Sequence, residues 1–163
     1  MKKAIILLAP GFEETEAVTI IDLLRRADIQ VRITGLTEGA VTGSHGISIM
    51  TDAFIEDVTP TEYDLLILPG GQPGSDNLKR DPLVLEWLKG RDSENGLIAA
   101  ICAAPTVLQE AGILKGKKVT SFPAEQAAFS GSTYLEDAVV RDGNIITSRG
   151  VGTASDFSLA LVE

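Results

Sequence analysis

Cysteine and histidine are almost absent from this chain, which has one of each among its 163 residues. A single cysteine excludes a disulfide within the chain. One cysteine and one histidine are also a poor donor set for a structural zinc site, which takes four protein ligands. We therefore expect no metal and no other cofactor, and we expect a reducing, cytoplasmic setting.

Long hydrophobic runs and an excess of positive charge are also missing. No segment approaches the roughly 20 apolar residues of a membrane span, so we expect no membrane partner. Lysine and arginine total 14 against 23 acidic residues, and the net charge of −9 disfavours binding to nucleic acid. The apolar start at residues 1–8 is similar to a short signal peptide, but no small-residue cleavage site follows it, so we interpret it as a first strand.

What remains is an alternation of strands and helices typical of one soluble domain over residues 1–163. The apolar pattern predicts strands at 3–9, 29–34, 63–68, 97–101 and 118–121, and helices at 13–27, 81–91, 103–111 and 154–163. It further predicts a turn-rich segment at 41–50 that ends in a short strand, a helical turn at 123–129, and a hairpin at 139–146 with Asp142-Gly143 as its loop. This order predicts a flavodoxin-like α/β fold, with a doubly wound, mostly parallel sheet sandwiched by helices. Ligands bind such sheets at the carboxyl ends of the strands.

Cys102 lies on the turn between the predicted strand at 97–101 and the helix that begins at Ala103. In that position a thiol faces unpaired backbone N–H groups and the positive end of a helix dipole, which stabilise a thiolate. We therefore predict that the pKa of Cys102 is below the value of about 8.5 that a free cysteine has. The alternative is a buried structural cysteine that acts as a small hydrophobic side chain.

Three acidic residues, Glu13, Glu14 and Glu16, begin the first predicted helix. The helix dipole accounts for Glu13 and Glu14, because it favours negative charge in the first turn. Glu16 stands one step further into the helix, beside Ala17 and Val18. If it faces Cys102, it would be partly desolvated and would share its proton with the thiol as a general acid and base.

A glycine loop, Pro69-Gly-Gly-Gln-Pro-Gly74, follows the strand at 63–68. It lacks both the G-x-G-x-x-G fingerprint and the lysine of a P-loop, so we expect no nucleotide there. Free N–H groups in this loop, near a thiolate, would form an oxyanion hole. The alternative is a tight turn that needs glycine geometry.

Two further side chains have both a structural and a functional interpretation. His45 lies in the polar segment Gly43-Ser-His-Gly46, and we interpret it as a solvated loop histidine rather than as the base that activates Cys102. Arg149 ends the predicted hairpin, where a surface arginine is the ordinary interpretation. Near a thiolate, Arg149 would instead bind an anionic or carbonyl ligand.

The segment 96–105, Gly-Leu-Ile-Ala-Ala-Ile-Cys-Ala-Ala-Pro, resembles the nucleophile elbow of the ThiJ/PfpI superfamily, in its DJ-1 branch. The same branch is matched in order and spacing by Glu-Glu-Thr-Glu at 13–16, Arg-Arg-Ala at 25–27, Asp-Leu-Leu-Ile-Leu-Pro-Gly-Gly at 64–71 and Thr-Ser-Arg-Gly at 147–150. The resemblance extends over essentially the whole chain, and its motifs are specific in combination.

The resemblance implies a role for each matching residue. Cys102 would be the reactive, oxidisable cysteine, and Glu16 the protonated glutamate bonded to it. Gly71 and Ala103 would supply N–H groups to an oxyanion, with Gly70 shaping the loop. Family members are described as glyoxalases that convert methylglyoxal to lactate without glutathione, as protein deglycases, and as oxidative-stress sensors or holdase chaperones. The resemblance thus implies a small carbonyl substrate such as methylglyoxal and a homodimer, and it leaves enzyme and sensor as alternatives.

Three positions depart from the family pattern. Phe122 stands where the DJ-1 branch often has histidine, and a phenylalanine cannot transfer protons, so a Cys-His dyad is excluded there. Ala103 stands where the protease branch has histidine, which disfavours an intracellular protease. Glu163 ends the sequence before the final helix of longer members, which leaves two alternatives: a more open site than in those members, or a sequence that is truncated there.

Overall fold

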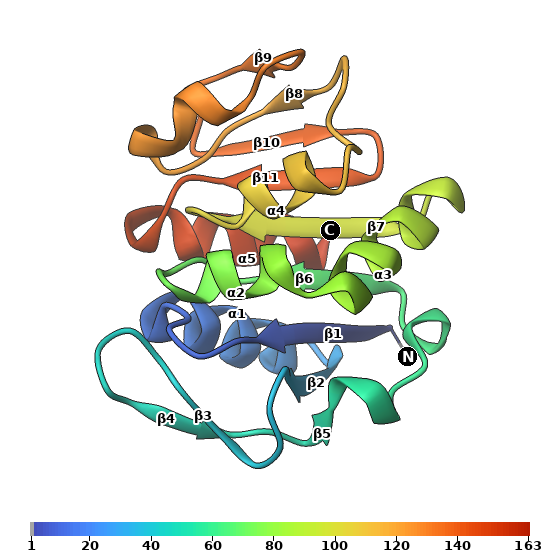
Figure 1. The fold of residues 1–163 in the computed structure, drawn as a ribbon, viewed down its shortest axis with the longest axis vertical. Helices are drawn as coiled ribbons and strands as arrows, with labels where there is room; N and C mark the ends of the chain where they lie inside the picture. Colours follow the sequence, from blue (N-terminus) through green and yellow to red (C-terminus); the bar gives the residue numbers. More distant parts are fainter. Residues whose placement is uncertain (1) are drawn as a thin grey trace.

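A seven-stranded sheet forms the centre of the computed structural model, which describes residues 2–163 (Figure 1). In spatial order its strands are β10 (Val139–Asp142), β11 (Ile145–Ser148), β7 (Leu97–Ile101), β6 (Leu65–Leu68), β1 (Lys3–Leu8), β2 (Gln30–Gly35) and β5 (Ala53–Phe54). All neighbours are parallel except β10 and β11. The sheet order reverses between β1 and β6, as in doubly wound folds.

Helices cover both faces of the sheet (Figure 1). One face packs against α1 (Glu14–Arg26) and α5 (Ala154–Val162), and the other against α2 (Gly74–Arg80), α3 (Pro82–Ser93) and α4 (Pro105–Glu110). Short 3₁₀ turns lie at η1 (Ile55–Asp57), η2 (Pro60–Glu62), η3 (Pro123–Ala128) and η4 (Val151–Thr153). This architecture confirms the predicted flavodoxin-like α/β fold.

Strand β1 shows why the apolar runs in the sequence are nearly continuous. Ile5 and Leu7 point into the core beneath α2, α3 and α4, whereas Ile6 and Leu8 point into the core beneath α1 and α5. Successive side chains of a strand face opposite sides of the sheet, and here both sides are covered. No polar alternation is therefore found along β1.

Two hairpins differ from their sequence predictions. The segment expected to end in one short strand forms two antiparallel strands, β3 (Ala40–Thr42) and β4 (Ser48–Met50). The loop of the β10–β11 hairpin is Gly143-Asn144, one residue later than predicted, because Asp142 pairs with Ile145. Gly143 takes a φ of 61°, and the Asn144 side chain donates to the Gly96 carbonyl at 3.2 Å.

The remaining differences concern short elements. Strand β8 (Lys118–Val119) is two residues shorter than predicted, and it pairs with β9 (Thr133–Tyr134) in a separate two-stranded sheet. Helix α2 was not predicted, because Leu78 is its one apolar side chain and forms no periodic stripe. None of the helices within residues 2–163 is both long and apolar enough to cross a membrane.

Candidate active site

The carboxyl ends of β7, β6 and β1 lie side by side, because these three strands are neighbours in the sheet. Cys102 follows β7, the glycine loop follows β6, and the start of α1 follows β1. The last two segments are joined directly: the Glu13 N–H donates to the Gly70 carbonyl at 2.8 Å, and the Gly74 N–H donates to the Gly11 carbonyl at 3.1 Å. The fold therefore brings the predicted thiol, carboxyl and loop to one edge.

Cys102 has a left-handed backbone conformation, with φ at 65°. Its N–H donates to the Ser148 carbonyl at 3.0 Å, and its carbonyl accepts from the Phe122 N–H at 2.8 Å. Residues 102–104 form a turn, and α4 begins at Pro105 and has only six residues. The chain therefore bends sharply at the thiol, and hydrogen bonds to two other segments hold the bend.

The Glu16 side chain is fully buried in the first turn of α1. Its Oε2 accepts the Gly70 N–H at 2.8 Å, and the carboxyl lies beside the Cys102 side chain, since both pack against Gly70. Its Oε1 is buried without a nitrogen or oxygen partner among the described residues. Only glycine fits at position 70, because a Cβ there would lie 2.4 Å from the Cys102 Cβ and 2.7 Å from Glu16 Oε2. The structure thus brings Glu16, Gly70 and Cys102 into contact.

Burial raises the pKa of Glu16 to about 7; the Gly70 N–H and the Cys102 thiol oppose the rise, and the charge of Glu13 adds to it. Burial also raises the pKa of Cys102, to about 12, helped by the charge and hydrogen bond of Glu16. Between these values the pair holds one proton and one negative charge, which belong to both groups together. Burial and the Glu16 carboxylate therefore act against the low pKa predicted for the thiol, whereas the N–H groups of Gly71 and Ala103 favour it.

The backbone N–H groups of Gly71 and Ala103 oppose the rise in the pKa of Cys102, because they favour a negative charge on its sulfur. Gly71 has φ at 94°, and a Cβ there would lie 2.3 Å from the Glu13 nitrogen. Both its conformation and its close packing therefore require glycine. The two N–H groups come from different strand ends, after β6 and after β7, and both act on the thiol. Their role as oxyanion donors stays a prediction.

Arg149 is engaged with the backbone of the loops that flank the site. Its Nε donates to the Ser121 carbonyl at 3.3 Å, and its Nη1 donates to the Glu136 carbonyl at 3.0 Å. None of the hydrogen bonds it makes within residues 2–163 reaches Cys102 or Glu16. Phe122, the next residue after Ser121, is about half exposed. The role of Arg149 in binding substrate stays a prediction.

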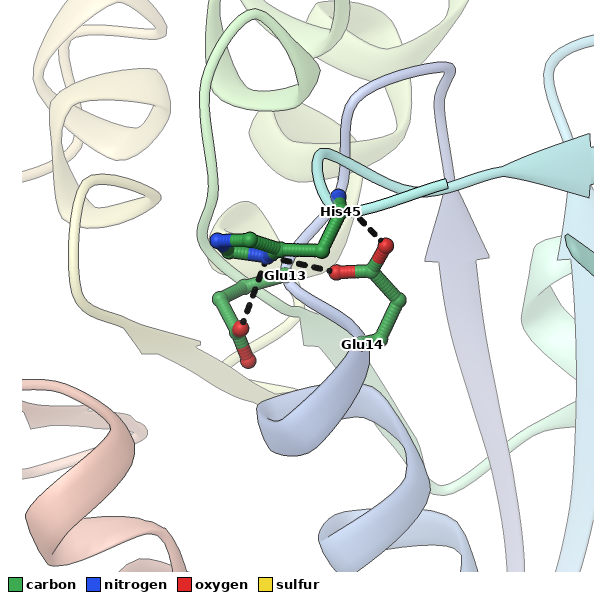
Figure 2. A group of neighbouring side chains, drawn as sticks. All are labelled: Glu13, Glu14 and His45. Atoms are coloured by element: carbon green, nitrogen blue, oxygen red, sulfur yellow. Dashed lines mark hydrogen bonds and ion pairs between the residues drawn. The ribbon is translucent and has the colours of Figure 1, made fainter. Parts of the chain in front are cut away.

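Beside this pair lies a second polar cluster, formed by Glu13, Glu14 and His45 (Figure 2). His45 Nδ1 is 3.1 Å from Glu14 Oε2 and 3.6 Å from Glu13 Oε1. The His45 side chain is 71% exposed, whereas that of Glu14 is 5% exposed. His45 therefore belongs to an exposed loop, as interpreted, and its partners are glutamates rather than Cys102.

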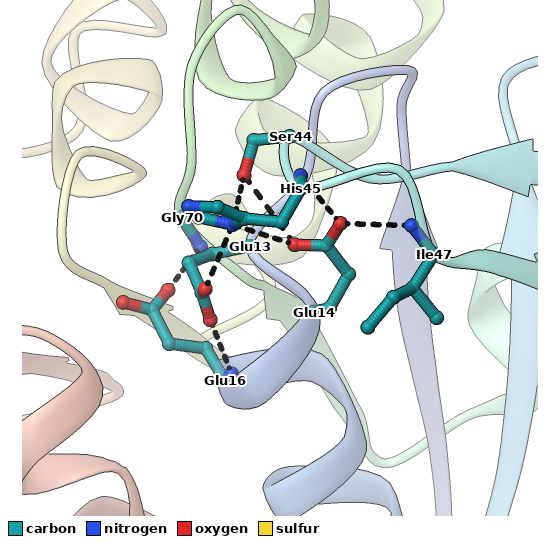
Figure 3. Close-up of polar contacts among 7 residues, drawn as sticks. All are labelled: Glu13, Glu14, Glu16, Ser44, His45, Ile47 and Gly70. Atoms are coloured by element: carbon teal, nitrogen blue, oxygen red, sulfur yellow. Dashed lines mark hydrogen bonds and ion pairs between the residues drawn. The ribbon is translucent and has the colours of Figure 1, made fainter.

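Glu14 binds the tip of the β3–β4 hairpin (Figure 3). Its Oε1 accepts the N–H groups of His45 at 2.6 Å and Ile47 at 3.3 Å, and its Oε2 accepts the Ser44 hydroxyl at 3.4 Å. Burial raises the pKa of Glu14, but hydrogen bonds from its own backbone and from His45 and Ile47 outweigh burial and lower it to about 2. The sequence analysis did not predict that Glu14 binds the hairpin, because the nearest of these partners, Ser44, lies 30 residues away in the sequence.

The donor atoms of Glu13, Glu14 and His45 all lie within 4.8 Å of one another, and they are the one group of potential metal ligands found in residues 2–163. Both oxygens of Glu14 already accept hydrogen bonds from protein donors. The cluster is therefore satisfied as a hydrogen-bonded network without a cation.

Comparison with known proteins finds relatives along the whole chain. The DJ-1/PfpI family matches residues 2–163. The chain is 44% identical over 165 residues to Protein dj-1beta of Drosophila melanogaster, covering 99% of this chain and 88% of that protein. It is 38% identical over 164 residues to the glutathione-independent glyoxalase DJR-1.2 of Caenorhabditis elegans, again covering 99% and 88%.

Solved structures agree with the sequence matches. The crystal structure of Drosophila DJ-1beta superposes with a TM-score of 0.96 at 44% identity, covering 99% of this chain and 89% of that one. The structure of oxidized Toxoplasma gondii DJ-1 superposes with a TM-score of 0.95 at 36% identity, covering 100% and 90%. With a family match over residues 2–163 and relatives at this level of identity, the chain belongs to the DJ-1/PfpI family.

Proposed function

We propose that this protein converts small α-oxoaldehydes such as methylglyoxal to 2-hydroxy acids such as lactate, without glutathione, through Cys102 and Glu16. The observation that carries the proposal is the contact between a thiol on a strained turn and a buried carboxyl whose pKa is about 7. A general acid and base works best when its pKa is near the working pH. The C. elegans relative, named as a glutathione-independent glyoxalase, supports the same reaction type.

The first step joins the sulfur to the aldehyde carbon. The thiol proton of Cys102 passes to the Glu16 carboxylate as the new S–C bond forms, and the C=O electron pair moves onto the oxygen. The N–H groups of Gly71 and Ala103 stabilise the resulting oxyanion. Glu16 then returns the proton to this oxygen, which gives a neutral hemithioacetal. A thiol with a raised pKa is thus activated by its neighbour, not by loss of its proton to solvent.

The second step moves a proton between adjacent carbons. Glu16, again a carboxylate, removes the hydrogen of the former aldehyde carbon, and the electron pair moves into a C=C bond while the neighbouring carbonyl becomes an enediolate oxygen. Glu16 then delivers this proton to the neighbouring carbon, and the hydroxyl proton of the first carbon passes to the enediolate oxygen. The first carbon regains a C=O bond, so that the hemithioacetal becomes a thioester of the 2-hydroxy acid. Water hydrolyses the thioester, releases lactate and restores the thiol. The sum is methylglyoxal plus water giving lactic acid, with no external oxidant or reductant.

The competing proposal is a redox sensor or redox-regulated chaperone that uses the same cysteine. Oxidation by a peroxide would convert the thiol to a sulfinate. Glu16 in its protonated form, together with the Gly71 and Ala103 amides, would donate charge-assisted hydrogen bonds to the sulfinate oxygens. The relative described as oxidized T. gondii DJ-1 motivates keeping this alternative.

The decisive experiment measures lactate formed from methylglyoxal by the wild type and by Cys102→Ser. We expect the substitution to reduce kcat/KM by about 10³-fold or more, because it removes the nucleophile of a covalent mechanism. If the wild type forms no lactate above the buffer rate, the glyoxalase proposal is wrong. A two-oxygen adduct on the Cys102 peptide after mild peroxide treatment would then favour the sensor.

A further inference from the structure

Glu13 forms hydrogen bonds with two segments of the candidate site, the turn that carries Glu16 and the glycine loop. It is the N-cap of α1, and its Oε2 accepts the Glu16 N–H at 2.8 Å (Figure 3). Its own N–H donates to the Gly70 carbonyl at 2.8 Å. One residue therefore fixes the backbone of the carboxyl-bearing turn and the backbone of the glycine loop relative to each other.

The packing at this junction leaves little freedom. A Cβ at Gly71 would lie 2.3 Å from the Glu13 nitrogen, so the loop rests directly on the Glu13 backbone. The Glu13 side chain is 12% exposed. A shift of Glu13 would therefore move Glu16 and the N–H of Gly71 together, and these are two groups that converge on Cys102.

Glu13 also brings a negative charge close to Glu16. Three titratable groups surround the two glutamates: the Cys102 thiol from the β7–α4 turn, His45 from the β3–β4 hairpin, and Glu14 from α1. His45 Nδ1 is nearer to Glu14, at 3.1 Å, than to Glu13, at 3.6 Å. A like charge in a partly buried position disfavours the ionised form of its neighbour.

We propose that Glu13 is a positioning residue with two separable actions: its hydrogen bonds hold Glu16 and the glycine loop against Cys102, and its negative charge disfavours a second negative charge on Glu16. This inference rests on the proposed Cys102–Glu16 pair. An ordinary helix cap would affect only stability, since capping needs an acceptor and not a charge.

Three substitutions separate the two actions. Glu13→Gln keeps an oxygen acceptor for the Glu16 N–H and removes the charge. Glu13→Asp keeps both the charge and a favoured capping side chain. Asp22→Asn removes a charge from an exposed position further along α1, where Asp22 pairs with Arg26, and serves as the matched control.

The main readout is the protonation midpoint of Glu16, followed by the infrared band of its protonated carboxyl and assigned by its loss in Glu16→Gln. We expect Glu13→Gln to lower this midpoint by about one pH unit, because a like charge is removed. Glu13→Asp and Asp22→Asn should leave the midpoint near the wild-type value. The pH profile of Cys102 alkylation by iodoacetamide should shift in parallel.

An unchanged midpoint in Glu13→Gln, or an equal shift in Asp22→Asn, would overturn the electrostatic part of the inference. Glu13→Ala tests the other part, because it removes the acceptor as well as the charge. We expect it to slow lactate formation about tenfold more than Glu13→Gln does; equal rates would refute the positioning action. The infrared midpoint does not require turnover, so it tests Glu13 even if the wild type forms no lactate.

Discussion

Glu14 and Glu16 stand two residues apart at the start of α1, and the structure buries both side chains. Their acidities nevertheless move in opposite directions, since the pKa of Glu14 is lowered to about 2 and that of Glu16 is raised to about 7. Glu14 faces the tip of the β3–β4 hairpin, and Glu16 faces the carboxyl ends of β6 and β7. The same residue type on the same turn thus meets two different surroundings.

The difference lies in the number of hydrogen-bond donors that meet each carboxyl. Glu14 accepts backbone N–H groups from His45 and Ile47 as well as side-chain donors, whereas Glu16 accepts one backbone N–H, that of Gly70. Burial disfavours both charges, and only a carboxylate with several donors overcomes that cost. Glu14 is therefore a fixed anion that holds the hairpin, and Glu16 retains a proton that is easily exchanged.

The largest expected effect is on catalysis, where only Glu16 should be needed. Glu16→Gln should lower kcat/KM for methylglyoxal by about 10²- to 10³-fold, because an amide cannot carry a proton between carbon atoms. Glu14→Gln should change it less than about threefold, since Glu14 does not touch Cys102. Steady-state lactate assays on both variants test the comparison. Similar losses in the two variants would mean that Glu14 belongs to the reaction chemistry.

A pair of glycines offers the next test, because each packs against one of the two carboxyls. Gly70→Ala places a Cβ 2.4 Å from the Cys102 Cβ and 2.9 Å from the Ile101 carbonyl, and these atoms cannot move aside. Gly43→Ala places a Cβ 2.3 Å from Glu14 Cδ, in a longer side chain. We expect about 3 kcal/mol of lost stability for Gly70→Ala and about 1–2 kcal/mol for Gly43→Ala. Urea unfolding measures both, and the reverse order would contradict this view of the site.

The pH dependence of stability should show the two carboxyls as opposite slopes. Glu14 binds its proton less tightly in the folded chain, so the free energy of unfolding should rise between pH 2 and 4.5 as it ionises. Glu16 binds its proton more tightly when folded, so stability should fall between pH 4.5 and 7. The free energy of unfolding should change by about 3 kcal/mol over each of these two pH ranges, because one pKa unit corresponds to about 1.4 kcal/mol.

Single substitutions show which carboxyl causes the rise and which causes the fall in stability. Glu14→Gln should flatten the rise on the acid side and lower stability at pH 7, and Glu16→Gln should flatten the fall towards neutral pH. Denaturant melts collected across the pH range provide the curves. A wild-type curve that rises steadily from pH 2 to 7 would show that Glu16 has an ordinary carboxyl pKa.

The smallest effect concerns His45. Its ring is largely exposed, so the hydrogen bond to Glu14 contributes little in competition with water. We expect His45→Gln to lower stability by about 0.5 kcal/mol and to leave the lactate rate unchanged. A large loss of activity in this variant, measured in the same assay, would mean that the imidazole takes part in the reaction. The surroundings of Glu14 would then no longer differ in function from those of Glu16.

Local sequence patterns were enough to predict the elements that carry the candidate site. The apolar runs of β1, β6 and β7 could form only buried strands, and the helix start at Asp81-Pro82 is confirmed, with Asp81 accepting the Leu83 N–H at 2.9 Å. The position of Cys102 on a turn followed from the same patterns. Helix α2 escaped prediction, because its stability comes from Leu78 packing into the core and not from a periodic stripe.

Properties that depend on distant segments could not be predicted in this way. The role of Glu14 requires the hairpin tip, which lies at residues 44–47. The acidity of Cys102 depends on its burial and on the neighbouring Glu16 carboxyl as well as on the local turn, and the sequence pattern shows only the turn. Partner residues far apart in sequence, and the desolvation they cause together, become visible only in the folded chain.

The positive φ of Cys102, at 65°, affects how this position responds to selection for stability. A residue with a Cβ is held there against its own conformational preference, at a cost of order 1 kcal/mol, and glycine would be free of that cost. A chain selected for stability alone would therefore be expected to drift towards Cys102→Gly, gaining robustness and losing its thiol. Protein engineers who raise the melting temperature of this scaffold by unbiased selection should expect to recover that inert chain, unless thiol reactivity is part of the screen.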